Sequence, residues 1–477
     1  MLLGRLSLKP GHQLLPAPDG GVLLRRAPLR ASRCNAAAFR LLKQCQEGLL
    51  LAPESSPPAP VCQFLDTLWQ AGFLAWQPQT PAELPHVTVI VPVFNRAQGI
   101  GDCLEALLAL AYPKDKLEII VVDDGSQDDT PDQVRQYPVK LLALACNRGQ
   151  SAARNIGAAA AQGEILAFID SDCIADPQWL LELVPYFQDE RLALVGGYVD
   201  AYYRRTWLDR FEEVQSPLNM GREMALGVGP DSDFYVPTCN VLIRKEVYLR
   251  LGGLDEDLRL GEDVDLCWRL KAQGHHLLYV PKGKVRHQHR AHFWPAYRRR
   301  FDYGTSEAFL FTQHRRVRKR FPWKPTGAAL AGLLALLLLT GALELLAGAA
   351  AVWLGHSWQQ RRLLQEKIGL ALPWHLLLAA TGKEQLAWLY FFTLHLQRYY
   401  LVLFCLLALW WPQTAPLVAV IILLPVALEY CRRRPRLPFL AYAFFFLAEQ
   451  IFYQLGVFWG CVKAWSFAPY HLVLVRK

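Results

Sequence analysis

The chain has 477 residues, of which 53% are hydrophobic and 19% charged, and its formal net charge is +9. An average soluble domain has roughly 25% charged residues, so this composition excludes a disordered or fibrous protein and favours a membrane protein. Residues 1–325 have an ordinary globular composition, whereas 326–462 contain long runs of Leu, Ala, Val, Phe and Trp. The sequence therefore predicts a soluble part followed by a membrane part.

Cysteine usage and the amino terminus indicate the compartment of the soluble part. The eleven cysteines occur singly, in an odd total and without a C-x-x-C pair, which suits a reducing compartment. The first twenty residues lack the apolar core of a signal peptide. We expect the soluble part in the cytosol, attached to the inner cell membrane by a multi-pass segment.

Basic residues gather just before the first long apolar run, at 298–300 and 315–320. Such a cluster marks the cytoplasmic side and attracts anionic lipids, which makes membrane lipids an expected partner. The chain has no basic helix with interleaved aromatic residues and no zinc or winged-helix recognition signature. Nucleic acid is therefore not an expected partner.

Residues 1–76 read as a small unit, and residues 77–86 as a Pro-rich linker. The predicted elements of the unit 1–76 are a β-hairpin turning at 19–21, helices over 35–45 and 61–73 with Gly72 as a C-cap, and a loop over 53–60.

Residues 87–285 alternate strands and helices, which predicts a mostly parallel sheet with helices on both faces. Ligands of such a sheet bind at the carboxyl ends of its strands. The predicted strands are 87–92, 117–122, 141–144, 165–169 and 276–280, and the predicted helices are 101–110 and 151–161.

The last part of the chain predicts three or four membrane crossings. Two stretches, 328–354 and 437–462, are long enough to span a bilayer. Between them, 399–411 and 417–428 form either one kinked span or a hairpin whose first helix extends back to Leu386. The arginines that follow prefer the cytosol and favour the kinked span.

Acidic residues follow two of the predicted buried strands directly. Asp123 comes after the strand 117–122, and Asp170 and Asp172 come after the strand 165–169. One such Asp is most simply a helix cap, but two sets at strand ends are harder to explain in that way. Oxygen ligands placed here suit Mg²⁺ or Mn²⁺, which neutralise the charge of a departing diphosphate.

A third acidic cluster contains Glu262 and Asp263 and opens a predicted helix, where the helix dipole alone favours acids. One of these carboxylates is also suited to removing a proton from an attacking hydroxyl. Two imidazoles follow the strand 276–280. We expect His287 to complete a metal site, with His289 as second choice.

Five motifs in order resemble those of family 2 glycosyltransferases. They are Val-Pro-Val-Phe-Asn-Arg (91–96), Asp-Asp-Gly-Ser (123–126), the segment 147–157, Asp-Ser-Asp (170–172) and Gly-Glu-Asp-Val-Asp-Leu-Cys-Trp-Arg (261–269). The resemblance covers about 87–290. It implies an α/β GT-A nucleotide-sugar-binding domain, an inverting mechanism and a nucleoside-diphosphate sugar as donor.

The resemblance also implies roles for individual residues. Asp123 would accept a hydrogen bond from the base, which favours uracil and a UDP-sugar, and Asp263 would be the general base. Pro92, Val93, Asn95 and Arg154 would contact the nucleotide, Asp170 the ribose, and Asp172 and His287 the metal, while Glu262, Trp268 and Asn240 would lie near the acceptor. The Gln-x-x-Arg-Trp motif of processive synthases is missing, so polymerisation through a membrane channel is not expected.

The amino-terminal unit resembles the PqqD-like, winged-helix-type domains that recognise peptides. The hairpin, a turn at 28–35 and two helices ending near 74 carry this likeness. Such domains bind a peptide by adding it as a strand to a sheet edge. The alternative is a degenerate domain that only braces the rest.

The order of the parts is similar to that of the mycofactocin-system glycosyltransferases. This similarity implies transfer of glucose from UDP-glucose to a peptide-derived redox cofactor, by a chain organised as 1–76, 77–86, 87–325 and 326–477. Two alternatives stay open at this point. They are a transferase acting on a lipid-linked or cell-envelope glycan, and a non-catalytic membrane scaffold that recruits a peptide.

Overall fold

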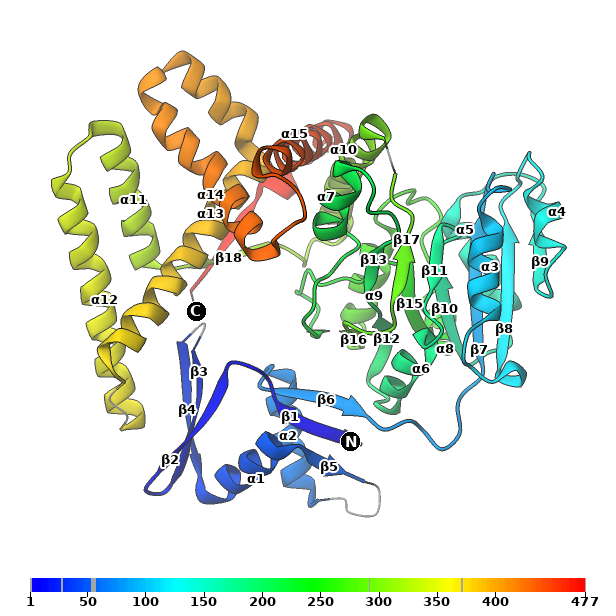
Figure 1. The fold of residues 1–477 in the computed structure, drawn as a ribbon, viewed down its shortest axis with the longest axis horizontal. Coiled ribbons are helices and arrows are strands. Elements are labelled where there is room, and N and C mark those ends of the chain that lie inside the picture. Colours follow the sequence, from blue (N-terminus) through cyan, green and yellow to red (C-terminus); the bar gives the residue numbers. More distant parts are fainter. Residues whose placement is uncertain (1, 27–28, 53–56, 291, 370–371, 477) are drawn as a thin grey trace. The chain divides into compact units, whose positions relative to one another are not determined.

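A computed structural model describes residues 2–26, 29–52, 57–290, 292–369 and 372–476. The chain divides into two compact units, each built from segments that are distant in the sequence (Figure 1). Unit 1 comprises 1–77, 320–434 and 472–477, and unit 2 comprises 78–319 and 435–471.

Unit 2 is built on an eight-stranded sheet whose central strands are almost wholly apolar and buried on both faces. Across the sheet the strands are β14 (Ala225–Gly227), β16 (His276–Tyr279), β12 (Leu192–Gly196), β15 (Asn240–Arg244), β10 (Ile165–Ile169), β7 (Val87–Val93), β8 (Leu117–Asp123) and β9 (Lys140–Ala143).

The sheet is mostly parallel, as the sequence predicted, with two strands running in the opposite direction. Strands β10, β7, β8 and β9 are parallel, but β15 runs antiparallel to both β10 and β12, and β14 is antiparallel to β16. A buried strand has the same apolar pattern in either direction, so its sequence does not reveal its orientation. The parallel half contains the first two sets of acids.

Helices cover the sheet, as predicted. A Cβ on Gly157 would lie 2.6 Å from Ile90, so this glycine allows α5 to approach β7 closely. The helices of unit 2 are α3 (Ile100–Leu108), α4 (Thr130–Val134), α5 (Gln150–Ala160), α6 (Trp179–Leu183), α7 (Trp207–Gln215), α8 (Lys245–Arg250), α9 (Glu262–Ala272), α10 (Phe293–Gln313) and α15 (Phe439–Ala464).

A second, three-stranded sheet extends unit 2 beyond the carboxyl end of β10. Its central strand β17 (Val285–His287) pairs antiparallel with β11 (Cys173–Ala175) and parallel with β13 (Val199–Ala201). The register places Cys173 opposite His287.

The amino-terminal part of unit 1 confirms the predicted hairpin and adds to it. Strand β4 occupies 29–35, where the sequence predicted a turn, because its backbone pairs with β3 along its whole length. Pro28 of that prediction lies outside the described residues. The strands form the sheets β5-β1-β6 and β2-β3-β4, with bounds β1 (Gly4–Leu8), β2 (His12–Ala17), β3 (Gly20–Arg26), β4 (Leu29–Asn35), β5 (Leu49–Leu51) and β6 (Leu74–Pro78).

Two helices accompany these sheets. Helix α1 (Ala36–Glu47) begins where predicted, because the Asn35 side chain accepts a hydrogen bond from the Ala38 amide at 2.8 Å. Helix α2 (Ala59–Gln70) begins inside the stretch predicted as a loop, and its C-cap is Ala71, one residue before the predicted Gly72. Residues 53–56 of that predicted loop lie outside the described residues.

The carboxyl-terminal helices correct two predictions. The expected span over 328–354 is two helices, α11 (Pro325–Thr340) and α12 (Glu344–Ile368), because Gly341 adopts φ +73° and ends the first. The expected kinked span is a hairpin of α13 (Trp374–Trp410) and α14 (Ala415–Arg433), the alternative that the sequence had left open.

Within the described residues, three helices are long and apolar enough to cross a membrane. They are 374–410, 412–433 and 439–464, whereas α11 is shorter. A two-stranded sheet of β18 (Lys319–Trp323) and β19 (Leu472–Arg476) completes the chain.

Candidate active site

The acids lie at one edge of the sheet, as their positions after strands predicted. The register of β7 and β8 places Val93 beside Asp123, and β10, which precedes Asp170, is the other neighbour of β7. Asn95 joins the loops of this edge, since its side-chain Oδ1 accepts a hydrogen bond from the Gln127 backbone amide at 2.8 Å. Its φ of +49° is one that Asn tolerates better than most residues.

Asp123 has one carboxylate oxygen in use and one free for a ligand. The side chain is buried, and Oδ2 accepts a hydrogen bond from the Ser126 amide at 3.2 Å. Oδ1 is buried and has no hydrogen-bond partner among the described residues. A buried carboxylate oxygen is costly to leave unpaired, so this atom fits an incoming donor group. Among the residues predicted to contact the nucleotide, Pro92 is half-buried and Val93 is buried.

Arg154 connects two of the three acidic clusters. Its side chain on α5 is 1% exposed and forms an ion pair with Asp170. Its Nη1 atom lies 3.7 Å from Oε1 of Glu262, at the start of α9. The guanidinium therefore brings the end of β10 and the beginning of α9 together.

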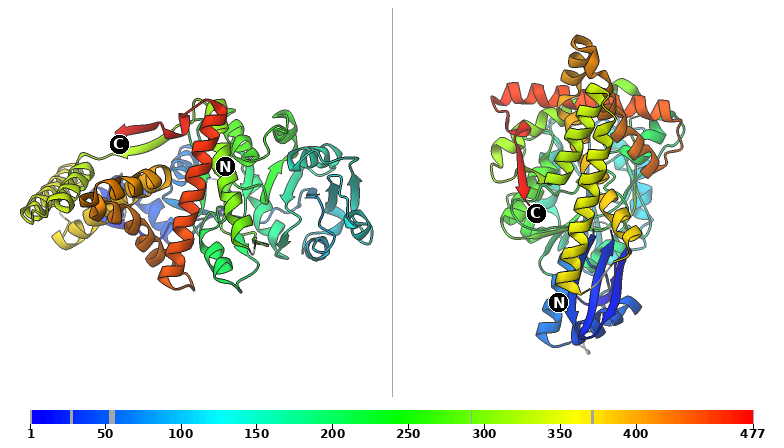
Figure 2. Two further views of the ribbon diagram at one scale, coloured as in Figure 1. Left: turned by 90° about the horizontal axis from the view of Figure 1, so that it is seen from above. Right: turned by 90° about the vertical axis from the view of Figure 1, so that its left-hand side faces the viewer.

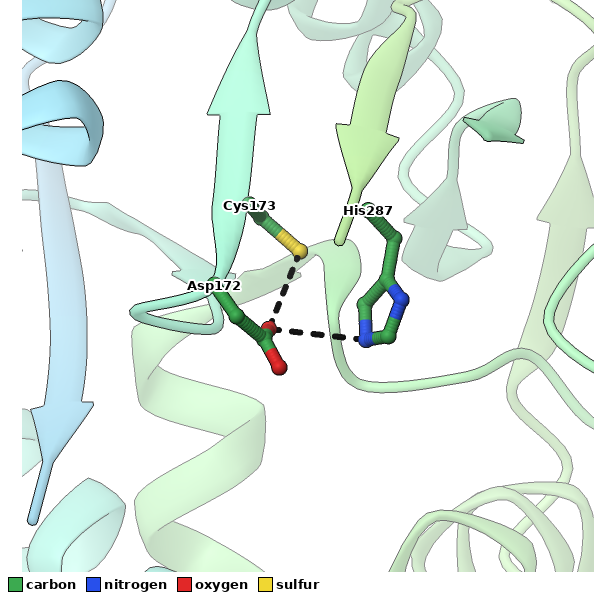
Figure 3. Close-up of side chains that lie close together, drawn as sticks. All are labelled: Asp172, Cys173 and His287. Carbon is green, nitrogen blue, oxygen red and sulfur yellow. Dashed lines mark hydrogen bonds and ion pairs between the residues drawn. The ribbon is translucent and has the colours of Figure 1, made fainter. Parts of the chain in front are cut away.

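Asp172, Cys173 and His287 form a cluster whose ligand atoms lie within 4.8 Å of one another (Figure 3). Oδ1 of Asp172 is 3.4 Å from Nε2 of His287 and 3.7 Å from Sγ of Cys173. The pairing of β11 with β17 holds them there, and the Gln288 amide donates to the Asp172 carbonyl oxygen at 2.9 Å. The other ring nitrogen of His287, Nδ1, lies within hydrogen-bond distance of Nδ1 of His289, at 3.1 Å.

The donor set fits a hard or intermediate cation such as Mg²⁺ or Mn²⁺. Asp172 and His287 supply an oxygen and a nitrogen at the partly exposed side of the cluster. Burial raises the pKa of the Cys173 thiol well above its usual value, and its soft sulfur suits a hard cation poorly. Burial, and then His287, lower the pKa of His289 to about 3, which keeps this second imidazole neutral.

The first turn of α9 supplies two carboxylates with different surroundings. Glu262 is buried, and burial followed by the neighbouring Asp263 raises its pKa. Asp263 is partly exposed, and burial raises its pKa as well, while a hydrogen bond from the Val264 amide opposes this. A raised pKa suits a group that exchanges protons near neutral pH.

The structure gives no support to acceptor contacts by Trp268 and Asn240. Trp268 is 4% exposed and packs against Phe311 and His314. Asn240 is 1% exposed, and its amide donates to the carbonyl oxygens of Tyr198 and Gly283 and accepts from the Trp179 indole. Both side chains stabilise the fold.

The sequence analysis missed Arg299 on α10. The guanidinium lies 4.9 Å from the ring centre of Tyr303, and the next residues along that helix face, Ser306 and Leu310, border Gly261 at the start of α9. Burial would lower the pKa of Arg299, but Tyr303 and the carboxylates of Glu262 and Asp170 raise it. Because Arg299 lies within a run of basic residues, the sequence indicated only a lipid contact for it.

Comparison with known proteins agrees with this geometry. Residues 88–252 match the model of glycosyl transferase family 2. This segment is a family 2 glycosyltransferase domain. Together with the α/β sheet, the match identifies a GT-A-like fold in unit 2.

Two curated relatives are glycosyltransferases. The pre-mycofactocin glycosyltransferase of Mycobacterium tuberculosis (strain ATCC 25618 / H37Rv) is 33% identical over 300 residues, covering 62% of this chain and 61% of that protein. Glycosyltransferase AglE of Haloferax volcanii is 34% identical over 204 residues, covering 41% of this chain and 65% of that protein. The matched region thus spans less than two thirds of either relative.

Among solved structures, the mannosyltransferase PcManGT from Pyrobaculum calidifontis, in complex with GDP-Man and Mn²⁺, is 19% identical with a TM-score of 0.46. The match covers 84% of this chain and 95% of that one.

Proposed function

We propose that the chain is an inverting, metal-dependent glycosyltransferase that uses a UDP-sugar and works at the cytosolic face of the inner membrane. One observation carries this proposal: buried Arg154 contacts both Asp170 and Glu262. Asp172 follows Asp170 by two residues, and Asp263 directly follows Glu262, so this contact supports a shared site for the two. Glycosyl transfer from a diphosphate requires a metal ligand and a proton acceptor, which these two residues would supply.

Each group has a distinct task in the proposed reaction. Asp172 and His287 would hold a divalent cation, which supplies positive charge for the donor diphosphate. Asp123, through its unpaired oxygen, would bind the base, and Arg299 would face the phosphates from α10. Asp263 would take the proton of the acceptor hydroxyl as its oxygen attacks the anomeric carbon opposite the leaving UDP.

For the acceptor, we propose a peptide-derived redox cofactor of the premycofactocin kind, with glucose as the sugar. The named M. tuberculosis relative supports this choice. The PqqD-like reading of 1–76 also supports it, because β2 and β4 are both edge strands to which an extended peptide can add. We retain the division into 1–76, 77–86, 87–325 and 326–477 as part of this proposal.

A lipid-linked or cell-envelope glycan is the second candidate acceptor. The observation in its favour is the hairpin of α13 and α14, whose apolar helices would bring the enzyme to a membrane-bound substrate. A scaffold without catalysis is a weaker alternative, because buried Arg154 pairs with acids of two clusters that catalysis would use.

Product analysis tests the proposal. Membranes containing the full chain are supplied with UDP-glucose or other UDP-sugars, Mn²⁺ and a peptide-derived acceptor, and the products are identified by mass spectrometry. A hexose added to the acceptor, and absent with Asp263→Asn, supports the proposal. Sugar found only in the lipid extract supports the second candidate. If no acceptor gives metal-dependent turnover of a UDP-sugar, the result supports the non-catalytic scaffold.

A further inference from the structure

We propose that α15 lies in the plane of the membrane surface and does not cross the bilayer, although its length and composition permit a crossing. This inference concerns topology and stands independently of the proposed activity. It follows from the neighbours of α15 within unit 2.

A charged helix of unit 2 accompanies α15 along its length. Helix α10 packs against it, as Figures 1 and 2 show, and the two backbones approach closely. A Cβ on Gly304 would lie 2.3 Å from the Tyr453 carbonyl oxygen, and one on Gly456 would lie 2.0 Å from that of Phe301. A crossing α15 would draw α10, with Arg298, Arg299, Arg300, Asp302 and Glu307, into hydrocarbon, where charges are costly.

Both ends of α15 contact residues of unit 2. Near its beginning, the Tyr442 hydroxyl accepts a hydrogen bond from Gln215 on α7. Just after its end, the Lys319 ammonium donates to the Pro469 carbonyl oxygen at 2.7 Å. A helix fixed at both ends to one water-soluble domain cannot place those ends on opposite sides of a membrane.

Polar groups on α15 point toward unit 2. Arg300 donates to both carboxylate oxygens of Glu212 at 2.7 Å and lies 3.8 Å from Glu449 on α15. Farther along, the Tyr453 hydroxyl donates to Glu307 at 2.8 Å. The carboxylate of Glu449, which a bilayer core would disfavour, thus has a protein partner.

The opposite face of α15 is an exposed apolar stripe. Its members recur at helical spacing and are Leu440, Phe444, Ile451, Leu455, Phe458 and Val462. Between them and the buried face, Trp459 is exposed, and Trp465 and Phe467 are exposed just after the helix. An exposed apolar face with aromatic residues at its boundary is a feature of helices that lie in a membrane interface.

A lipid surface is the occupant that fits this stripe. Helix α14 is a candidate span, and α15 begins six residues after α14 ends. The intervening segment and the end of α14 carry Arg432, Arg433, Arg434 and Arg436, which suit anionic headgroups.

Reporter fusions to the full chain test the topology. Green fluorescent protein and alkaline phosphatase are each fused before the first residue, after Lys477, and within the turn 412–414 between α13 and α14. The fluorescent protein should be active at both chain ends, and the phosphatase only at the turn. Phosphatase activity at the carboxyl end, with fluorescence at the amino end, would overturn the proposal.

Photocrosslinking tests the lipid contact. Benzoylphenylalanine replaces Phe444 or Phe458 on the stripe, and Phe446, which is 4% exposed, in the matched control. Lipid adducts are expected at the first two positions and not at the third. Each variant is compared only if its fluorescent fusion elutes as a single folded species. Equal lipid labelling at all three positions, or none at any, would contradict an interfacial helix.

Discussion

Asp172 and His287 come from distant parts of the sequence, yet Oδ1 of the first lies 3.4 Å from Nε2 of the second. The antiparallel pairing of β11 with β17 fixes this distance, because it places the neighbouring Cys173 opposite His287. The site therefore depends on backbone hydrogen bonds between two three-residue strands.

Removing either proposed metal ligand should weaken metal binding. Asp172→Asn and His287→Ala each delete one donor, and we expect Mn²⁺ affinity to fall by at least roughly ten-fold, with a larger loss of transfer. Titration calorimetry measures the affinity. As a matched control, Cys173→Ser should keep Mn²⁺ affinity within about two-fold, because a soft sulfur contributes little to a hard cation. Unchanged affinity in His287→Ala would contradict its assignment.

Asp263→Asn should separate binding from transfer. The substitution keeps the shape of the side chain but removes its ability to accept a proton, so turnover should fall by ~10²–10⁴. UDP affinity should stay close to that of the unaltered protein. Near-normal turnover would show that another group removes the proton.

The pH dependence of transfer should reflect the raised pKa of Asp263. A general base acts only when deprotonated, so kcat/KM should fall as pH decreases through this pKa, which lies above the usual value of about 4 for Asp. Because the folded state binds this proton more tightly than the unfolded state, Asp263 also lowers the free energy of unfolding as pH rises through the same range. Rate profiles and thermal unfolding of Asp263→Asn check both effects. An unfolding profile as steep in the variant as in the parent would exclude Asp263 as the source.

Arg154→Met should destabilise the fold strongly. The substitution leaves the Asp170 and Glu262 carboxylates without their shared partner, and breaking a buried pair costs about 3–5 kcal/mol. Arg148→Met is the matched control, since its ion pair with Glu256 is about half exposed and should contribute at most about 1 kcal/mol. Thermal unfolding of both variants provides the comparison. Equal losses of stability would contradict the bridging role of Arg154.

Arg299→Met should raise the KM for the UDP-sugar by roughly ten- to a hundred-fold, because a charge-assisted hydrogen bond to phosphate contributes about 1.5–3 kcal/mol. Arg298→Met changes the neighbouring, exposed arginine and should leave this KM unaltered. Steady-state kinetics at saturating acceptor distinguishes the two variants. An equal effect of both would point to the charge of the helix rather than to the position of Arg299.

Much of the site could be predicted from residues alone. Asp123, Asp170 and Asp172 directly follow runs of buried apolar residues, and the ends of parallel strands meet at one edge of a sheet. His287 was harder to place, yet its position after the strand 276–280 made it a candidate. Arg299 was not predicted, because the sequence of a basic run does not show whether a given arginine faces lipid or a carboxylate.

Side-chain direction defeated sequence reasoning for Trp268 and Asn240. Both lie within or beside the right elements, but a helix or strand has more than one face, and packing decides which one meets the site. The same holds for α15, whose composition matches a membrane span while its polar residues face α10.

The sequence by itself determined the order of strands and helices, the strand-end position of the first acids and the break between soluble and apolar parts, because these follow from local periodicity and composition. Only the tertiary structure decided the direction of β15, the end of the first apolar helix at Gly341 and the partners of Glu449. Those depend on pairing and packing between segments far apart in the chain, which no local pattern records.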